Sequence, residues 1–490
     1  MRALPVRLLV VLIPFVGIVA PLMAQSQESA AGLPRSPVLV DPAADSLGLE
    51  SPTLNLGDAA AQDSQSKPFC CDRRHFWTAL GEVGMVLVIP WYFNRHVSDD
   101  STAILSLDSW KKNILEGMEW DHDDLKTNMF AHPFHGSLYF NAARSNGYSF
   151  WQSAAWSWGG SFLWEMFGEN NPGAINDWAA TAIGGIALGE GLHRTAKMIR
   201  NNSGTGFGRS ASELGAFLID PMGGASRLFR GEWSRIGENP EDRFPEDGGT
   251  VMQAGVRVVG EDGVDSLQTS GYFALDLRYG DPFREYEKPF DYFQLAVQIN
   301  GRTEKTSLGR LQMEGVLFGT KLKESDKAEH VFHFTQHYDY VNNNTLETGG
   351  SSLAGSFLSR YKLSDSWNMV TKFEPSALLI WGTESEYADF TKRTYDFGSG
   401  LGFRGFAGAT HRGRELIGLS YLFFWQHTLN GAVGDHLMHY LGARAAVPVY
   451  KGFGLGAEYW LTIRDSNYRD FPDVTRKNPQ LRIFAIWFVR

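Results

Sequence analysis

Strand-length segments of alternating polarity fill the C-terminal half of the chain, from about residue 251 to residue 489. In residues 272–279, Phe273 and Leu277 would lie on one face of an extended strand, with Asp276 on the other. Such a strand can separate lipid from water only if its backbone groups are all paired, and in a bilayer only helices and closed barrels meet that condition. The alternation therefore predicts an antiparallel barrel that crosses a membrane.

The alternating segments number about twelve, and bacterial outer-membrane barrels have an even number of strands. Their lengths are near the roughly ten residues that a tilted strand needs to cross the apolar layer. Aromatic residues gather near the segment ends, as in the interfacial girdles of membrane barrels. These features favour a transmembrane barrel over the alternative of a soluble sandwich or soluble barrel. The segments are Gly249–Gly260, Gln268–Tyr279, Phe290–Asn300, Leu308–Leu322, His330–Tyr340, Gly350–Tyr361, Trp367–Trp381, Tyr395–Phe406, Arg414–Trp425, Leu437–Val447, Gly452–Arg464 and Gln480–Val489.

The N-terminus has the features of an exported protein. Arg2 and Arg7 accompany an apolar core at residues 8–19, and a small residue precedes the expected cut after residue 24, which indicates a secretory signal peptide. An uncleaved membrane anchor is the alternative. Residues 25–68 are rich in Ala, Ser, Pro, Gly and Asp and nearly lack aromatic residues, so we expect a disordered tether there.

Charge and cysteine content limit the partners of the chain. The net charge is -10 at neutral pH and no basic run is present, which argues against a nucleic-acid partner. The two cysteines, Cys70 and Cys71, are adjacent at the end of the tether. In an oxidising compartment they could form a vicinal disulfide or a bridge to another chain, or remain two incidental thiols in a mobile segment.

A second kind of pattern occupies residues 69–200. Three apolar stretches there lack the period of two and are long enough for helices: Phe76–Ile89, Ser149–Phe167 and Gly173–Met198. We expect Pro90 to end the first of them. The predicted division of the chain is a signal peptide at 1–24, a tether at 25–68, a helical domain at 69–200, a helical connector at 201–248 and a β-barrel at 249–490.

Acidic residues interrupt the apolar helices, at Glu82, Glu165, Asp177 and Glu190. A charge at the centre of a membrane-spanning helix costs about 3 kcal/mol. We therefore expect these helices to form a plug-like bundle in the barrel lumen or against its periplasmic mouth, and not to face lipid.

The polar residues of the helical domain form a candidate site. His132, Glu165 and Asp177 are the candidates for catalysis, because imidazole and carboxylate groups can act as general bases or hold a divalent metal. His132 precedes Pro133 and is therefore expected in an extended segment. The favoured interpretation is a structural cluster of buried hydrogen bonds and ion pairs with residues such as Arg144 and Arg194, with Arg144 as a partner of Glu165 and no metal or cofactor. That cluster comprises His132, His135, Arg144, Ser161, Glu165, Glu169, Asp177 and Glu190.

The spacing of these and neighbouring residues resembles a known family. The run comprises His132-Pro133, Gly136, Tyr139-Phe140, Ala143-Arg144, Gly147, Gly160-Ser161, Trp164-Glu165, Glu169, Pro172, Asp177, Gly184-Gly185 and Gly189-Glu190. Over about residues 75–200, it resembles the bacterial family called domain of unknown function 3943. The resemblance implies a signal peptide and a β-rich C-terminal half, and it implies no established activity.

Together these features predict an α+β protein, with a helical bundle or plug followed by a transmembrane barrel of about twelve strands. The predicted location is the outer membrane, with membrane lipid and the barrel assembly machinery as partners. The predicted role is non-enzymatic, in envelope structure, assembly or passage. The alternative is an outer-membrane enzyme that acts on lipid or envelope polymer through the His/Glu/Asp cluster. Polar inward positions such as Glu314, His337 and Asp339 suit either an open channel or a plugged lumen.

Overall fold

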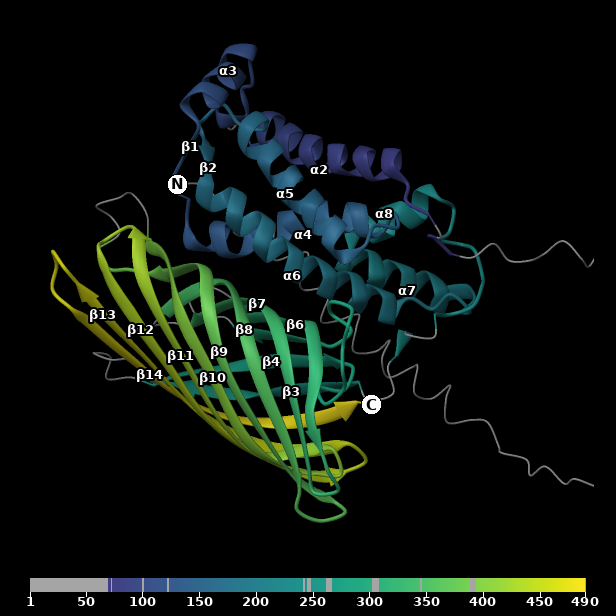
Figure 1. Cartoon of the computed structure of the whole chain (residues 1–490), viewed down its shortest axis with the longest axis vertical. Coiled ribbons are helices and arrows are strands. Elements are labelled where there is room, and N and C mark those ends of the chain that lie inside the picture. The colour runs from purple at the N-terminus through teal and green to yellow at the C-terminus, as the bar shows by residue number, and fades with distance from the viewer. Residues whose placement is uncertain are drawn as a thin grey trace, which may run out of the picture.

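The computed structural model divides into a group of helices and a barrel, shown in Figure 1. It describes residues 69–489 except 72, 99–100, 121–122, 241–242, 245–247, 261–266, 302–307, 344–345 and 388–393. The predicted signal peptide and tether lie outside the described residues.

Twelve antiparallel strands form a closed barrel, in which the last strand pairs with the first. Each predicted segment corresponds to one strand. Several strands run past the predicted ends, because backbone pairing continues where the polarity pattern fades. The α+β class and the strand count are therefore confirmed. The strands are β3 (Gly249–Val259), β4 (Gln268–Tyr279), β5 (Phe293–Asn300), β6 (Leu308–Glu324), β7 (Ala328–Asn343), β8 (Leu346–Lys362), β9 (Trp367–Glu384), β10 (Tyr395–His411), β11 (Arg414–Asn430), β12 (Gly434–Tyr450), β13 (Phe453–Tyr468) and β14 (Val474–Val489).

Contacts between strands that are not neighbours show which side chains face the lumen. Arg404 on β10 binds Asp339 on β7 at 2.6 Å, and Lys372 on β9 binds Glu314 on β6 at 2.8 Å. Two strands separate the members of each pair, so these side chains meet inside the barrel. Because side chains alternate along a strand, Tyr338 on β7 must point to the outside.

The outer wall is apolar over the strands from β8 through β14 to β3. Large apolar side chains are exposed there at alternate positions, on the face opposite the lumen. A contiguous apolar surface of this kind is typical of the lipid-facing band of a membrane barrel. Representative positions are Val256, Phe357, Phe373, Leu401, Leu419, Leu441, Leu455, Tyr459, Leu481 and Ile483.

Seven α-helices precede the barrel in the described part of the chain, and α4 lies at their centre. It packs against α2, α5 and α6 and has no exposed residue. Glycines let α4 and α6 approach closely, since a Cβ on Gly136 would lie 1.8 Å from the carbonyl oxygen of Thr181. The helices are α2 (Phe76–His96), α3 (Leu107–Glu116), α4 (His132–Arg144), α5 (Phe150–Phe167), α6 (Ile175–Ile199), α7 (Gly206–Ile219) and α8 (Pro221–Phe229), with a π-helical turn, η2 (Thr127–Ala131), before α4.

Two expectations about helix ends were wrong. Helix α2 continues through Pro90 to His96. A proline cannot donate to the carbonyl four residues earlier, here that of Val86, but the His135 ring lies 3.2 Å from that oxygen and supplies a hydrogen bond in place of the missing backbone one. His132 is helical, with φ -63° and ψ -50°, although Pro133 follows it. Packing of α4 on all sides outweighs the local preference for extended backbone.

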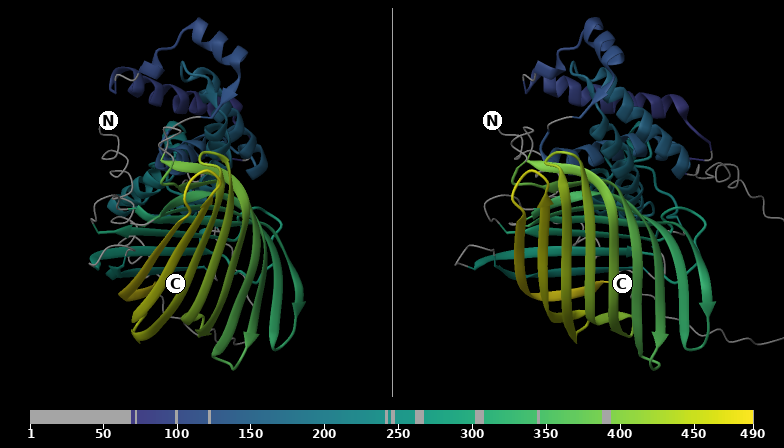
Figure 2. Two further views of the ribbon diagram at one scale, coloured as in Figure 1. Left: turned by 90° about the vertical axis from the view of Figure 1, so that its left-hand side faces the viewer. Right: turned by 60° about the vertical axis from the view of Figure 1, so that its left-hand side comes forward.

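The helical domain lies on the outside of the barrel. Tyr338 donates through its hydroxyl to the carbonyl of Met129 at 2.6 Å, and Gln336 donates to the carbonyl of Ile183 at 3.0 Å. Both β7 side chains point away from the lumen. Figure 1 shows α6 beside this wall, Figure 2 shows the group of helices against the barrel from two further sides, and α6 contacts strands β5 to β9. The expected plug in the lumen is therefore wrong, because charged side chains already occupy that space while the wall offers α6 an apolar surface.

Candidate functional site

The structure brings two of the three catalytic candidates together. His132 Nε2 lies 3.4 Å from Asp177 Oδ2, because the junction of η2 and α4 faces the first turn of α6. Asp123 lies close by, and one ligand atom from each of the three residues falls within 4.8 Å of the others. His132 and Asp177 are largely buried, whereas Asp123 is exposed, so the group reaches solvent.

Amide side chains orient this group. Asn176 donates to Asn128 Oδ1 at 3.0 Å and to Asp177 Oδ1 at 2.8 Å. Asp177 lies in the first turn of α6, where the helix dipole favours a negative charge. Two carboxylates and an imidazole could hold a divalent cation or transfer a proton. The sequence alone did not indicate Asn176, because a single amide matches no ligand spacing.

Glu165, on α5, contacts the start of α6. Its Oε2 accepts a hydrogen bond from the backbone N–H of Ala174 at 2.9 Å, and Ala174 is the N-cap residue of α6. Arg144 does not pair with Glu165, contrary to expectation, because the fold directs Arg144 to Glu190. Glu165 therefore supplies an acceptor to one of the backbone N–H groups at a helix N-terminus that have no partner within the helix.

Glu190 is the centre of a buried ion-pair group. It lies 2.8 Å from Arg144 and 2.8 Å from Arg194 and is fully buried. Burial alone would raise the pKa of Glu190, but the two guanidinium groups outweigh burial and lower the pKa to about 2. Arg194 also binds Asp291, in the β4–β5 connection, at 3.0 Å. This group thus ties the helical domain to the barrel.

The remaining predicted residues take part in helix docking. Ser161 donates to the carbonyl of Trp178 at 3.0 Å, which joins α5 to α6. Burial lowers the pKa of His135 to about 4, so its ring is neutral when it bonds to Val86. The backbone carbonyl of Glu169 accepts from Asn113 at 3.0 Å. These contacts hold neighbouring helices of the domain together.

A second charged group lies inside the barrel. Glu314, His337 and Asp339 were expected at inward positions, and the structure places them there beside Lys372, Glu374 and Arg404, which sequence reasoning did not single out. The sequence could have indicated two of them, because Lys372 and Glu374 are alternate residues of one predicted strand and therefore share a face. Glu314, His337 and Glu374 are close enough to share a metal ion. The Lys372 amine, however, lies 2.8 Å from both carboxylates and already supplies the positive charge.

The β4–β5 connection enters the lumen beside this group. The ring of Phe283 is buried against Val331 and Leu358, whose positions on β7 and β8 face inward. The guanidinium of Arg360 lies 4.3 Å from the centre of the same ring. Part of the lumen is therefore filled by the barrel's own connection.

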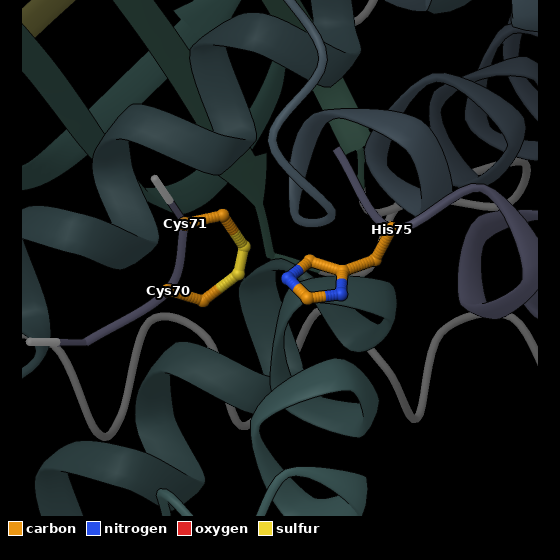
Figure 3. A group of neighbouring side chains, drawn as sticks. All are labelled: Cys70, Cys71 and His75. Carbon is orange, nitrogen blue, oxygen red and sulfur yellow. A yellow bond between two sulfur atoms is a disulfide. The ribbon is translucent and has the colours of Figure 1, made fainter. Parts of the chain in front are cut away.

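The adjacent cysteines form a third group, shown in Figure 3. Cys70 and Cys71 are joined by a disulfide, and the ring of His75 faces them. The backbone N–H of Cys70 donates to Glu232 Oε1 at 3.0 Å. Of the alternatives considered for these residues, the structure has the vicinal disulfide, and it is anchored to the helical domain.

Comparison with solved structures gives distant matches to the barrel half. NanC porin is 10% identical over 48% of this chain and 98% of its own, with a TM-score of 0.25. Outer membrane phospholipase A from Escherichia coli is 13% identical over 51% of this chain and 93% of its own, with a TM-score of 0.25. TM-scores of 0.25 do not establish a shared fold. The barrel is established by the pairing of its own strands. No curated protein matches the chain.

The helical half matches a family that the sequence had suggested. Residues 117–222 match the family described as a domain of unknown function, DUF3943. The matched stretch includes the His132–Asp177 pair, the Glu190 group and helices α4 to α7. The chain therefore contains a DUF3943 domain, here docked on the outer wall of a twelve-stranded barrel.

Proposed function

We propose that this chain is an outer-membrane β-barrel protein with a non-enzymatic role in the envelope, and that its lumen is held closed to free diffusion by its own charged side chains. The observation that carries the proposal is the set of ion pairs that link non-neighbouring strands through the lumen. The apolar outer wall supports the location, since such a surface is stable in lipid and not in water. Insertion by the barrel assembly machinery belongs to the same proposal.

The ion pairs form one connected group. Lys372 lies 2.8 Å from both Glu314 and Glu374, and His337 lies 3.3 Å from Glu374. Arg404 joins Glu374, at 3.7 Å, to Asp339, at 2.6 Å. Removing one member of a buried ion pair leaves an uncompensated charge, which costs about 3–5 kcal/mol. The group is therefore a stable obstruction, and opening a passage would require its rearrangement.

Conductance in planar bilayers tests this closure. We expect wild-type protein to insert and conduct weakly, and the double variant Lys372→Met/Glu374→Gln to conduct more because the obstruction is loosened. Lys323→Met, an exposed position at the end of β6, is the matched control and should behave as wild type. A large, stable conductance of the wild-type protein would contradict the closed lumen, and recovery of the protein from the soluble periplasmic fraction would contradict the location.

A second function is favoured by the meeting of Asp123, His132 and Asp177. The alternative proposal is an enzyme that acts on envelope lipid or polymer at this partly exposed group, with His132 as the base or a metal ligand. Purified protein would be assayed for release of fatty acids or polymer fragments, with and without added divalent metal. Loss of turnover in His132→Gln and Asp177→Asn, with normal barrel assembly, would support it. Absence of turnover by the wild-type protein on either substrate class would contradict the enzyme proposal.

A further inference from the structure

The outer face of α2 has the surface of a lipid-facing helix. Every exposed position from Phe76 to Phe93 carries an apolar side chain or glycine. Trp77 is 79% exposed and Ile89 is 63% exposed. The exposed positions are Phe76, Trp77, Leu80, Gly81, Val88, Ile89, Tyr92 and Phe93. Among the described helices, α2 alone is long and apolar enough to cross a membrane, and most of its residues are not buried, so it is not an ordinary core helix.

Helix α5 extends this surface. Its exposed positions are also apolar or glycine: Trp151, Ala155, Gly159, Phe162 and Leu163. The two helices meet where the rings of Phe76 and Trp156 lie 5.7 Å apart. A surface of this extent without a charged side chain would be costly in water, at about 25 cal/mol for each Å² of apolar area.

The acidic residues of these helices do not oppose contact with lipid. Glu82 of α2 accepts from Asn146 at 2.8 Å and from Ser226 at 2.6 Å, inside the domain. Glu165 of α5 is likewise buried and binds the start of α6. The cost of a charge in lipid, which argued against lipid contact from the sequence, therefore does not arise, because both carboxylates face protein.

The ends of α2 match the two surfaces of a bilayer. Arg73 and Arg74 are exposed before the helix, and Arg95 and His96 form its last turn. Trp77 and Tyr92 stand just inside these charged ends, where aromatic side chains favour the membrane interface. The 18 residues from Phe76 to Phe93 span about 27 Å at 1.5 Å per residue, close to the roughly 25 Å apolar band of an outer-membrane barrel.

We propose that the helical domain lies within the bilayer beside the barrel, with the exposed faces of α2 and α5 against lipid acyl chains. The domain occupies the outer wall of β5 to β9 through α6, and the apolar wall of β8 to β14 lies on the same outer side of the barrel. Figure 1 shows the helices at the side of the barrel. The inference rests on the proposed outer-membrane location of the barrel.

Spin labels on the full chain in lipid nanodiscs test the proposal. Single cysteines would be placed at Val88 and Phe162 in a Cys70→Ser/Cys71→Ser background. Leu455→Cys on the barrel wall is the lipid reference, and Lys112→Cys on exposed α3 is the water reference. The measurement is the accessibility of each label to oxygen, which concentrates in lipid, relative to a water-soluble nickel complex.

We expect labels at Val88 and Phe162 to give the high oxygen-to-nickel ratio of the Leu455 label. A ratio at Val88 and Phe162 like that at Lys112 would overturn the proposal, and so would low accessibility to both reagents, which would show that protein covers the face. If the Leu455 label itself resembles that at Lys112, the barrel is not in lipid and the proposed location fails instead.

Discussion

The hydrogen bond between His135 and Val86 makes a sharp test of how α2 tolerates its proline. The substitution His135→Phe removes the donor but keeps a ring between Tyr139 and Trp164, whose ring centroids lie 4.8 and 5.2 Å from that of His135. The carbonyl of Val86 would then be left without its side-chain donor inside the domain. A buried acceptor in that state costs about 1–3 kcal/mol, so we expect a loss of stability of that size.

A second substitution should rescue the first. Pro90→Ala restores a backbone N–H four residues after Val86, which can donate to the same carbonyl as in an ordinary helix. The double variant His135→Phe/Pro90→Ala should therefore lose much less stability than the sum of the single effects. A coupling of about 1–3 kcal/mol is expected for two groups that serve one acceptor.

Unfolding of the helical domain in detergent would be followed by tryptophan fluorescence during guanidinium titration, with Trp164 beside the altered ring. His96→Phe, the same exchange at an exposed position of α2, is the control and should be neutral. Additive effects of His135→Phe and Pro90→Ala would refute the reasoning, because they would show that the two residues do not share the Val86 carbonyl.

The same histidine gives a pH dependence. Its pKa is lowered from 6.5 to about 4 by burial, so the unfolded chain binds more protons than the folded one between these values. The contribution of His135 to stability should therefore fall as the pH drops from about 6.5 to about 4, by up to about 3 kcal/mol at 1.36 kcal/mol per unit. Glu82, whose pKa burial raises to about 7, contributes in the opposite direction, so the effect of His135 is read as the difference between the wild type and the variant. His135→Phe should remove that part of the dependence. An equal change in stability between pH 7 and pH 4.5 in the wild type and in His135→Phe would contradict the buried neutral ring.

Three further outcomes follow from the packing. Glu165→Gln should be mild, because the amide oxygen can still accept from Ala174, whereas Glu165→Ala should cost about 1–3 kcal/mol in the same titration. If the two variants destabilise equally, the capping role is wrong. Gly136→Ala should disrupt the domain, since its Cβ would meet the α6 backbone, while Gly159→Ala meets nothing within 4 Å and should be tolerated, as protease resistance would show. Tyr338→Phe should weaken docking on the barrel by about 1 kcal/mol, and unchanged proteolysis of the domain would count against that contact.

The candidate site shows which contacts lie beyond sequence reasoning. His132 and Asp177 are 45 positions apart in the chain, and they meet only because α4 and α6 pack together through glycines. Arg144 could have paired with any acid of the domain, and the helix register selects Glu190. The resemblance of the residue run to DUF3943 was confirmed, but a spacing pattern does not state which of its members touch.

The barrel shows the opposite case, because period-two alternation is a local property of each strand. Asp276, Glu314 and Asp339 were predictable as inward residues from their neighbours alone. The closed barrel was predictable because a sheet in a bilayer cannot leave an unpaired edge. The alternation cannot distinguish one outward residue from another. Tyr338 and Leu441 occupy equivalent outward positions, yet the helical domain covers the first and leaves the second exposed. The sequence by itself determined an apolar and a polar face for every strand, because successive side chains point to opposite faces and their polarity is fixed by residue type. Only the tertiary structure decided which part of the outer face binds protein, because that choice depends on the packing of elements far apart in the chain.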